Sequence, residues 1–344
     1  MEQKLGYMPL FRRFLSAVSR KMSNSYKDES NQRLQENHDI GGGLQMIGLK
    51  RGTVCLCAHE AEWEQNAAQT IMTLKEILGE VAVGIEHVGS TSVPRIKAKP
   101  IIDIAVAVHD FNDILKRQPL LQSHGFYYRP KCDIRDQLLF GCGSYYNGTG
   151  DLQTHFIHVV KANSMEWINY INFRNYLNHT PSVAKEYENL KLALAAKAPV
   201  DNGREQYLKG KHDFIVATLR KALADSYLGK TVTIKIDRPA GSAHPQYPDL
   251  IYPINYGYLP GVISGDGEEM DVYILGVDEP MAEFTGKIIG IIHRANDVED
   301  KLVAAPGGMI FSREQIAAAV HFQEQYYEST IETSTKNQSI AEGL

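Results

Sequence analysis

Apolar residues recur at helical spacing in some parts of the 344-residue chain and alternate with polar residues in others. Residues 60–78 follow the helical spacing, and residues 81–88 read as a strand that runs into a Gly-Ser pair. A second strand is expected over residues 99–104, and an amphipathic helix over residues 203–227 that ends near Gly229. Helices and strands therefore mix in this part of the chain. The apolar side of the first helix is formed by Trp63, Ala67, Ile71, Leu74 and Leu78.

The last third of the chain begins with strand patterns and ends with a helix. Residues 232–237 alternate apolar and polar side chains, as a half-buried strand does, and β character returns at residues 287–292 and 302–305. A Ser-x-x-Gln capping box predicts the start of a helix over residues 313–327. This order differs from that of the preceding part, so a separate domain is expected.

The two ends of the chain show weaker patterns. Apolar residues between Leu10 and Val18 line one face of a short helix that basic residues flank, and a polar linker follows. A docking helix or a leftover terminus explains this segment more simply than binding at a membrane surface. Beyond Ile331 the sequence is mostly polar, and a tail is expected.

A chain of this length exceeds one ordinary hydrophobic core, so two or three domains are expected. Hydrophobic residues make up 43% and charged residues 22%, which is typical of a soluble globular protein. No apolar run approaches the roughly 20 residues of a membrane helix, no signal-peptide pattern is present, and no cysteines form a C-x-x-C pair. A reducing, cytoplasmic location is therefore expected. The predicted domains are residues 1–48, 49–227, 228–332 and 333–344.

The net charge of −5 is unevenly distributed along the chain. From residue 228 onward there are 8 Lys and Arg against 17 Asp and Glu, whereas the first 227 residues carry a net charge of +4. An acidic domain repels nucleic acid, so the C-terminal part more plausibly handles small phosphates through metal ions.

Four acidic residues fall within six positions, and they are Asp266, Glu268, Glu269 and Asp271. Their mutual repulsion is costly in a folded domain unless cations neutralise it, and Mg²⁺ takes carboxylate oxygens as ligands. Gly265 and Gly267 allow the chain to turn sharply ahead of a strand that would begin at Asp271. A solvated acidic hairpin is the alternative, and the alternating acids of a calcium EF-hand loop are absent.

This region resembles the soluble family I inorganic pyrophosphatases, whose sequences read roughly YP-x-NYGY followed by DGDPxDV. The chain has NYGY at residues 255–258 and DGEEMDV at residues 266–272, in the same order and spacing. KLVAAP at residues 301–306 and FQEQY at residues 322–326 are similar to the family's KLVAVP and FFEHY segments. The resemblance implies a small β-barrel with a C-terminal helix that hydrolyses pyrophosphate with Mg²⁺.

The resemblance also implies roles for individual residues. The implied metal ligands are Asp266, Asp271 and Glu299; the implied catalytic residues are Glu268, Tyr256 and Lys301; and the implied substrate contacts are Tyr326, Arg238 and His244. Two family aspartates are replaced here by Glu268 and Glu299, and Tyr327 stands where the family has a lysine. The family's upstream Lys and Arg ligands have no clear match, and Arg238 or His244 is the replacement that the segment IDRPAGSAHP offers.

The middle of the chain places a Gly-Ser turn after one strand and a carboxylate on the next, as at the start of a nucleotidyltransferase site. Residues 86–94 and 99–104 carry these features. Together with residues 154–160 and 207–215 they resemble the GrpB family of nucleotidyltransferase-like proteins. The resemblance implies a mixed sheet with helices, and a nucleotide- or phosphate-binding site at Gly89, Ser90, Lys99, Asp103 and Arg174.

Asp103 stands alone on its strand, whereas active nucleotidyltransferases carry two acids as D-x-D. Ile101 and Ala105 occupy the partner positions, and one carboxylate holds two metal ions poorly. His155 and His158 are three residues apart, so a regular strand turns them to opposite faces. Binding of a nucleotide or phosphate is therefore favoured over transfer.

Two functional hypotheses from different classes remain. In the first, the C-terminal domain hydrolyses pyrophosphate or a related diphosphate with Mg²⁺, and the middle domain binds or transfers nucleotides. If the middle domain transfers nucleotides, the C-terminal domain removes the pyrophosphate that this reaction releases. In the second, both sites are degenerate and the chain is a non-catalytic scaffold that binds nucleotides or other phosphometabolites. The expected partners are small phosphates and a nucleotide. Nucleic acids and membranes are not expected as partners. Formation of a homo-oligomer is left open.

Overall fold

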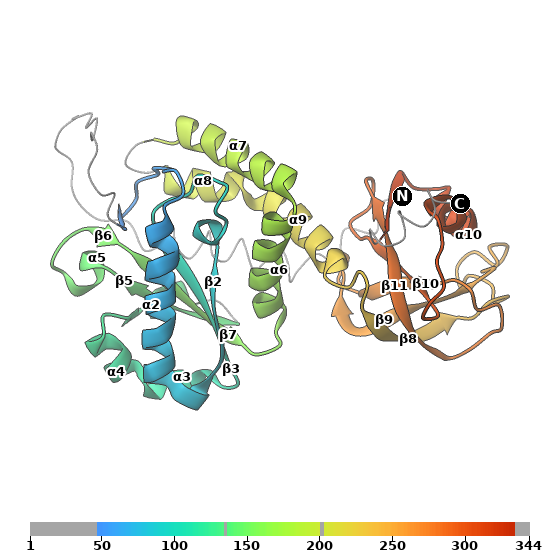
Figure 1. Cartoon of the computed structure of the whole chain (residues 1–344), viewed down its shortest axis with the longest axis horizontal. Coiled ribbons are helices and arrows are strands. Elements are labelled where there is room, and N and C mark those ends of the chain that lie inside the picture. The colour runs from blue at the N-terminus through green and yellow to red at the C-terminus, as the bar shows by residue number, and fades with distance from the viewer. Residues whose placement is uncertain (1–46, 134–135, 200–202, 334–344) are drawn as a thin grey trace. The chain divides into compact units, whose positions relative to one another are not determined.

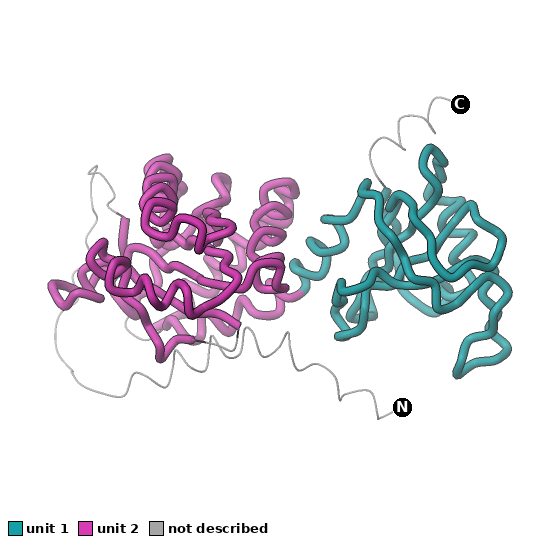
Figure 2. The backbone as a smooth tube through the Cα atoms, turned by 90° about the horizontal axis from the view of Figure 1, so that it is seen from below, with its two compact units in different colours: residues 1–11, 217–344 teal, residues 12–216 magenta. Residues whose placement is uncertain are grey.

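A computed structural model of the chain describes residues 47–133, 136–199 and 203–333. Within these residues the fold is mixed α+β, as the sequence predicts. The chain divides into two compact units, which Figure 2 colours separately. We call them the sheet unit, described from residue 47 to 216, and the barrel unit, described from residue 217 to 333. Their boundary falls inside a helix, and the domain limits expected from the sequence stay a prediction.

The sheet unit combines a mixed sheet with helices on its faces (Figure 1). In chain order its elements are β1 (Leu49–Lys50), α2 (Ala61–Leu78), η1 (Gly79–Val81), β2 (Ala82–Val88), η2 (Ser90–Ser92), β3 (Ile102–Val108), α3 (Phe111–Lys116), α4 (Gln118–Ser123), β4 (Tyr127–Tyr128), η3 (Pro130–Cys132), β5 (Gln137–Cys142), α5 (Ser144–Asn147), β6 (Leu152–Gln153), β7 (His155–Lys161), α6 (Met165–His179), α7 (Pro181–Lys197), α8 (Arg204–Gly210) and the first residues of α9 (His212–Asp225). The five-stranded sheet has the order β2-β3-β7-β5-β4, in which β3 and β7 are parallel and the other neighbours antiparallel.

Alternation along β3 decides which side chains meet each face of this sheet. The even-numbered residues of β3 share one hydrophobic core with Trp63 and Leu74 of α2. The odd-numbered residues, which include Asp103 and Ala105, point to the other face, where α6 packs. Within β3 only Asp103 supplies a carboxylate, and it lies on the α6 side.

The barrel unit holds a closed five-stranded β-barrel. Its elements after α9 are β8 (Thr231–Arg238), β9 (Asn255–Ile263), β10 (Glu269–Ile274), β11 (Glu283–Arg294), β12 (Lys301–Ala305), α10 (Arg313–Glu324) and β13 (Ser329–Thr333). The strand order is β12-β10-β9-β8-β11, and an additional β11–β12 pairing closes the ring. β13 extends the sheet beyond β11. The predicted barrel with a helix near its C-terminus is therefore confirmed.

The core of the barrel contains several tyrosine rings and one face of α10. Ile316 and Val320, four residues apart on α10, pack with Tyr252, Tyr256 and Tyr273. The predicted capping box is present, because Ser312 Oγ accepts from Gln315 N and the Gln315 side chain accepts from Ser312 N. α10 is thereby held over the barrel from its first turn.

Several element boundaries differ from those expected, and one of them is the start of β3, which lies at Ile102 rather than residue 99. The helix expected over residues 203–227 is divided into α8 and α9, and a Cβ at Gly210 would overlap Leu194, so this glycine lets α8 approach α7 closely. α10 ends at Glu324 rather than residue 327, in a final turn closed by short-range hydrogen bonds. β13 continues through buried Thr333, where a tail was expected.

The predicted N-terminal helix around residues 10–18 lies outside the described residues and stays a prediction. Among the helices that the structure describes, none has both the length and the apolar character that crossing a lipid bilayer demands.

Candidate functional site

A tight turn between β9 and β10 carries the first predicted metal ligand, Asp266. Ser264 N donates to the Glu268 carbonyl oxygen at 2.7 Å, and Asp266 Oδ1 accepts from Glu268 N at 2.9 Å. Gly267 has a φ of 93°, a left-handed conformation that glycine adopts without strain. The Glu268 side chain is exposed at this turn, so solvent can reach it.

Gly265 brings this turn against the loop that precedes β12. A Cβ atom at Gly265 would overlap the carbonyl oxygen of Val298, so a larger residue would push the two segments apart. Glu299 follows directly on that loop and is 5% exposed. The close approach therefore sets the Asp266 turn beside the segment that carries Glu299. Asp271 itself is the third residue of β10, not its first.

Lys301 lies between two of the predicted metal ligands. β10 and β12 are parallel neighbours with Val272 opposite Leu302, which places Asp271 beside Lys301. The buried Lys301 ammonium forms ion pairs with both Asp271 and Glu299. Glu299 Oε2 is also buried, and it has no hydrogen-bond partner among the described residues. A buried, unpartnered carboxylate oxygen is costly, and a bound cation would relieve that cost.

The chemistry of these side chains fits Mg²⁺, because Asp266, Asp271 and Glu299 offer hard carboxylate oxygens. Within the described part of the chain, however, no three His, Cys, Asp or Glu side chains already converge as a metal site. Asp271 and Glu299 share Lys301 as their counter-ion, while Asp266 is bonded within its own turn. The structure thus brings Asp271, Glu299 and Lys301 together, and holds Asp266 on the neighbouring turn.

Tyr256 and Arg238 lie on strands next to this group. Burial, followed by the nearby Asp271 carboxylate, raises the pKa of Tyr256 well above its ordinary value, so the phenol remains a hydrogen-bond donor. Arg238 Nη1 donates to Asp237 Oδ2 at 2.7 Å. Burial raises the pKa of Asp237, and Arg238 opposes this while Asp271 adds to it. Both predicted residues therefore belong to the same charged region as Asp271.

His244 and Tyr326 are placed differently. His244 Nδ1 accepts hydrogen bonds from the backbone N–H groups of Gln246 and Tyr247, at 3.1 and 3.2 Å, so it fixes a turn. The Tyr326 side chain is 69% exposed and makes no hydrogen bond to any described residue. Neither is joined to Asp271 or Lys301 by a contact in the described residues.

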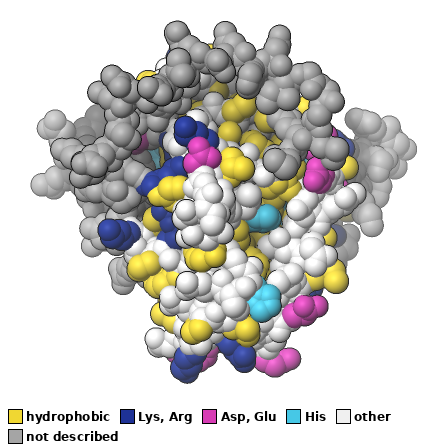
Figure 3. All heavy atoms as spheres, turned by 90° about the vertical axis from the view of Figure 1, so that its left-hand side faces the viewer, with side chains coloured by type: hydrophobic (Ala, Val, Ile, Leu, Met, Phe, Trp, Pro, Cys, Tyr) yellow, Lys and Arg dark blue, Asp and Glu magenta, His cyan; other side chains and the backbone are white. Residues whose placement is uncertain are grey.

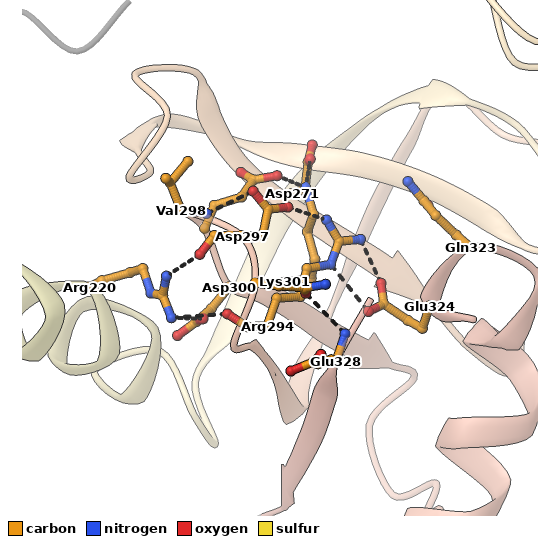
Figure 4. Close-up of polar contacts among 12 residues, drawn as sticks. Arg220, Asp271, Arg294, Asp297, Val298, Asp300, Lys301, Gln323, Glu324 and Glu328 are labelled. Atoms are coloured by element: carbon orange, nitrogen blue, oxygen red, sulfur yellow. Dashed lines mark hydrogen bonds and ion pairs between the residues drawn. The ribbon is translucent and has the colours of Figure 1, made fainter. Parts of the chain in front are cut away.

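A buried network that sequence reasoning missed supports the loop between β11 and β12 (Figure 4). Arg294 is 1% exposed and donates twice to Glu324, from Nη2 to Oε1 at 2.6 Å and from Nε to Oε2 at 3.1 Å. Its Nη1 donates to Asp297 Oδ2 at 2.9 Å. The Tyr327 ring centroid lies 3.6 Å from the guanidinium carbon. Tyr327, in the position of a family lysine, therefore stacks on a buried arginine.

Arg220, on α9, also holds this loop (Figure 4). Its Nη1 donates to the Asp297 carbonyl oxygen at 2.6 Å and its Nη2 to the Arg294 carbonyl oxygen at 3.2 Å. Nη2 also pairs with Asp300 Oδ1 at 3.2 Å. Arg220 therefore ties down residues on both sides of the predicted ligand Glu299. No sequence signal marked it, because it precedes the barrel and belongs to no recognised motif.

In the sheet unit, Gly89 turns the chain directly after β2, with a φ of 72°. A Cβ on this glycine would meet Asp103 Oδ2, so the turn lies against the carboxylate of the next strand. After the Gly-Ser pair the chain forms a single 3₁₀ turn, η2, in which Ser92 Oγ donates to the Gly89 carbonyl oxygen at 2.6 Å. Gly89 and Asp103 are thus neighbours, and Ser90 follows Gly89 in the chain.

A chain of hydrogen bonds orients Asp103. Tyr170 OH donates to Gln137 Oε1 at 2.9 Å, and Gln137 Nε2 lies 3.2 Å from His158 Nδ1. An amide N–H can only donate, so His158 Nδ1 accepts and His158 Nε2 donates to Asp103 Oδ1 at 3.2 Å. His155 contacts Thr70 of α2 on the opposite face. The two histidines therefore face opposite sides, as their spacing predicts.

The two basic residues predicted to bind an anion differ in their partners. Arg174 Nη1 pairs with Glu86 Oε2 at 2.7 Å and donates to the His87 carbonyl oxygen at 2.9 Å. Lys99 makes no hydrogen bond or ion pair with a described residue through its ammonium group. Arg174 is thus neutralised locally, whereas Lys99 is not.

Figure 3 shows a face on which basic side chains lie beside acidic and apolar ones. Among the described residues of this face, the basic side chains do not form one continuous surface. Binding of nucleic acid draws on such a surface. The expectation of small phosphates rather than nucleic acid as partners stays a prediction.

Comparison with known proteins assigns families to both parts of the chain. Residues 53–221 match the family described as GrpB protein, and residues 228–332 match Inorganic pyrophosphatase. The glutamate-rich protein GrpB of Alkalihalophilus pseudofirmus is 35% identical over 171 residues, which are 49% of this chain and 96% of that protein. The chain belongs to the GrpB family. Its GrpB domain is followed by an inorganic pyrophosphatase domain.

Two further relatives cover one domain each. GrpB from Enterococcus faecalis, a crystal structure, is 29% identical with a TM-score of 0.46, and the match covers 50% of this chain and 99% of that one. The inorganic pyrophosphatase of Saccharolobus solfataricus is 35% identical over 77 residues, which are 21% of this chain and 41% of that enzyme. The aligned segment therefore spans less than half the length of that relative. Both family relationships expected from the sequence are confirmed.

Proposed function

We propose that the pyrophosphatase domain hydrolyses inorganic pyrophosphate, or a related diphosphate, with Mg²⁺ as its cofactor. The observation that carries the proposal is the meeting of the Asp271 and Glu299 carboxylates at Lys301, where one buried Glu299 oxygen has no partner among the described residues. A site built from carboxylates and a buried lysine is suited to a polyanion that arrives with divalent cations.

Asp266, Asp271 and Glu299 are the residues that would hold Mg²⁺. When bound, the metal supplies positive charge that neutralises phosphate oxygens and makes water a better nucleophile. With these carboxylates holding the metal, the Lys301 ammonium group would be available to contact an oxygen of the substrate. Arg238, which pairs with Asp237 in the same charged region, is a further basic residue for that role, and Tyr326 and His244 remain proposals that need movement toward the group.

The reaction needs a water molecule aligned with the bridging P–O bond. The exposed carboxylate of Glu268 accepts a proton from that water while the water oxygen forms a bond to one phosphorus atom. The bond between the bridging oxygen and this phosphorus breaks, and the second phosphate leaves with the bridging oxygen. Lys301 and the protonated phenol of Tyr256 stabilise the negative charge on this leaving group. Two phosphates result.

The test is phosphate release from pyrophosphate and Mg²⁺ by the full chain and by Asp271→Asn. We expect the substitution to reduce kcat by about 100-fold or more, because it removes a charged ligand from the site. Glu283→Gln is the matched control, since Glu283 is exposed at the start of β11. Absence of phosphate release by the unaltered chain, or equal release by Asp271→Asn, overturns the proposal and favours the non-catalytic scaffold.

For the GrpB domain we propose binding of a nucleotide or another phosphorylated ligand next to Asp103. The specific observation in its favour is the Gly89 turn, which lies directly against that carboxylate. One carboxylate on β3 supports binding better than two-metal nucleotidyl transfer.

A further inference from the structure

In the GrpB domain, two lysines from distant parts of the sequence contact one tyrosine ring. Lys99 precedes β3, and Lys211 directly follows α8, which carries Tyr207. The Nζ atoms of Lys99 and Lys211 lie 5.1 and 4.7 Å from the centroid of the Tyr207 ring. Tyr207 is 1% exposed, so the ring is a fixed part of the core. The two ammonium groups are therefore held no more than about 10 Å apart.

Neither ammonium group has an acidic partner among the described residues. Lys209, two positions before Lys211, does pair with Glu205 at 2.9 Å. Lys185 pairs with Glu188 on the neighbouring helix α7. Pairing with a carboxylate is thus available to nearby lysines. Lys191 of α7 is different, because it donates to the Lys97 carbonyl oxygen and adds a further positive charge near Lys99.

Further positive charge surrounds Lys99, in addition to that of Lys211. Burial, and then the charges of Arg204 and Lys211, hold the pKa of Lys99 well below its ordinary value, while Asp103 opposes them. A cation against an aromatic face gains only about 0.5–2 kcal/mol, which does not cancel the repulsion of several like charges in a partly buried place. An anion would.

We propose that Lys99 and Lys211, held against Tyr207, bind the phosphate groups of a polyphosphate ligand. The ligand is a nucleoside polyphosphate or a free polyphosphate, since both offer the same oxygens. The inference rests on the proposed binding of a phosphorylated ligand near Asp103, and it is independent of hydrolysis by the barrel. It replaces Arg174 by Lys211 as the second anion contact, because Arg174 is already paired with Glu86.

The experiment is titration calorimetry on the full chain carrying Asp271→Asn, with EDTA present so that pyrophosphate chemistry at the barrel is suppressed. The probes are inorganic tripolyphosphate and ATP. Lys99→Met and Lys211→Met are each expected to weaken the binding of tripolyphosphate by about 10- to 100-fold, the effect of losing a charged hydrogen bond. Lys209→Met, two positions before Lys211 and within α8, is the matched control, and it should leave binding unchanged.

Thermal unfolding of each variant checks that the domain remains folded, and Lys211→Met keeps the test valid if Lys99→Met does not fold. ATP that binds more tightly than tripolyphosphate, with the same loss in both variants, identifies a nucleotide as the ligand class. Equal binding identifies a free polyphosphate. Failure of tripolyphosphate to bind overturns the inference. ATP binding that neither lysine affects also overturns it, while leaving the proposed nucleotide binding near Asp103 intact.

Discussion

His293, on β11, bridges two carboxylates of the barrel unit. Its Nδ1 lies 2.8 Å from Asp300 Oδ2 and its Nε2 lies 3.1 Å from Glu332 Oε2, so both ring nitrogens donate when the ring is charged. Burial lowers the pKa of His293, but the two hydrogen bonds outweigh it and raise the pKa from 6.5 to about 9. The charge balance also includes Arg220, which pairs with Asp300, and the nearby Lys221 and Arg313, which lower the pKa of Glu332.

The raised pKa of His293 predicts a pH dependence of stability. A group that binds its proton more tightly when folded contributes its full stability below the unfolded pKa of about 6.5, and loses it as the pH rises through 9. The free energy of unfolding of the barrel unit should therefore fall by on the order of 2 kcal/mol between pH 6.5 and 9.5. Urea unfolding across this range measures it.

His293→Gln should show a lower free energy of unfolding at pH 6.5 and a flatter profile above it. His321→Gln is the control, because His321 is exposed on α10. A profile for His293→Gln that still falls as steeply as that of the unaltered chain would assign the pH dependence to other groups.

The candidate residues that the structure brings together are those whose neighbours in the chain also fix their place in space. Asp271 and Lys301 each belong to a strand with a clear apolar pattern, and the parallel pairing of those strands makes the two residues neighbours. Tyr326 and Tyr327 follow the end of α10, where one residue of rotation decides which ring packs against the barrel. Tyr327 stacks on Arg294, and Tyr326 is exposed. Periodicity alone cannot settle a choice of that kind.

Helix α9 ends in the barrel unit, and Arg220 is its contact with the loop that carries Glu299. This arginine lies inside the region that matches GrpB, at residues 53–221, whereas the pyrophosphatase match begins at residue 228. The loop of the pyrophosphatase domain is thus held by a residue outside that domain's family boundaries. The fusion of the two families therefore has a structural consequence for the candidate site.

Arg220→Met should loosen this loop. The substitution removes two hydrogen bonds to backbone carbonyl oxygens and the ion pair with Asp300, so residues 294–300 lose their contacts on one side. We expect faster amide hydrogen exchange in that segment only, and an increase of about 5- to 20-fold in the Mg²⁺ concentration for half-maximal hydrolysis. Arg220→Lys should recover part of the effect, because it keeps a charge opposite Asp300.

Arg117→Met, at an exposed site of the sheet unit, controls for the loss of one arginine. The exchange measurement does not depend on catalysis, so it tests the role of Arg220 even in a chain that releases no phosphate. Unchanged exchange in residues 294–300 would show that Arg294 and its partners hold the loop unaided.

The helices and strands with strong periodicity were predicted closely, and the differences have local causes. α2 and β8 follow from uninterrupted patterns over many residues. The division between α8 and α9 depends on Gly210 packing against Leu194, sixteen residues away in the sequence, and β13 depends on pairing with β11. Both are tertiary effects, and a single sequence contains no direct signal for either.

The two units have separate hydrophobic cores. The core between α2 and the mixed sheet shares no residue with the core inside the barrel. The β11–β12 pairing closes the barrel, so the backbone hydrogen-bonding groups at its strand edges are paired within the barrel unit itself. The domain order could be predicted from the sequence, because each core has its own apolar pattern. The contact of Arg220 with the barrel loop could not, because it joins segments with no shared pattern.

Matched substitutions of one leucine in each core should separate the stabilities of the two units. Leu74 of α2 is 1% exposed and Leu275, after β10, is 2% exposed, so replacing either by alanine should cost about 2–5 kcal/mol in its own unit. In calorimetry, Leu74→Ala should lower the transition of the sheet unit and leave pyrophosphate hydrolysis at 25 °C unchanged. Leu275→Ala should lower the temperature at which hydrolysis is lost. A common shift of all transitions in both variants would mean that the chain unfolds as one cooperative body, and that the barrel depends on the GrpB domain for more than Arg220.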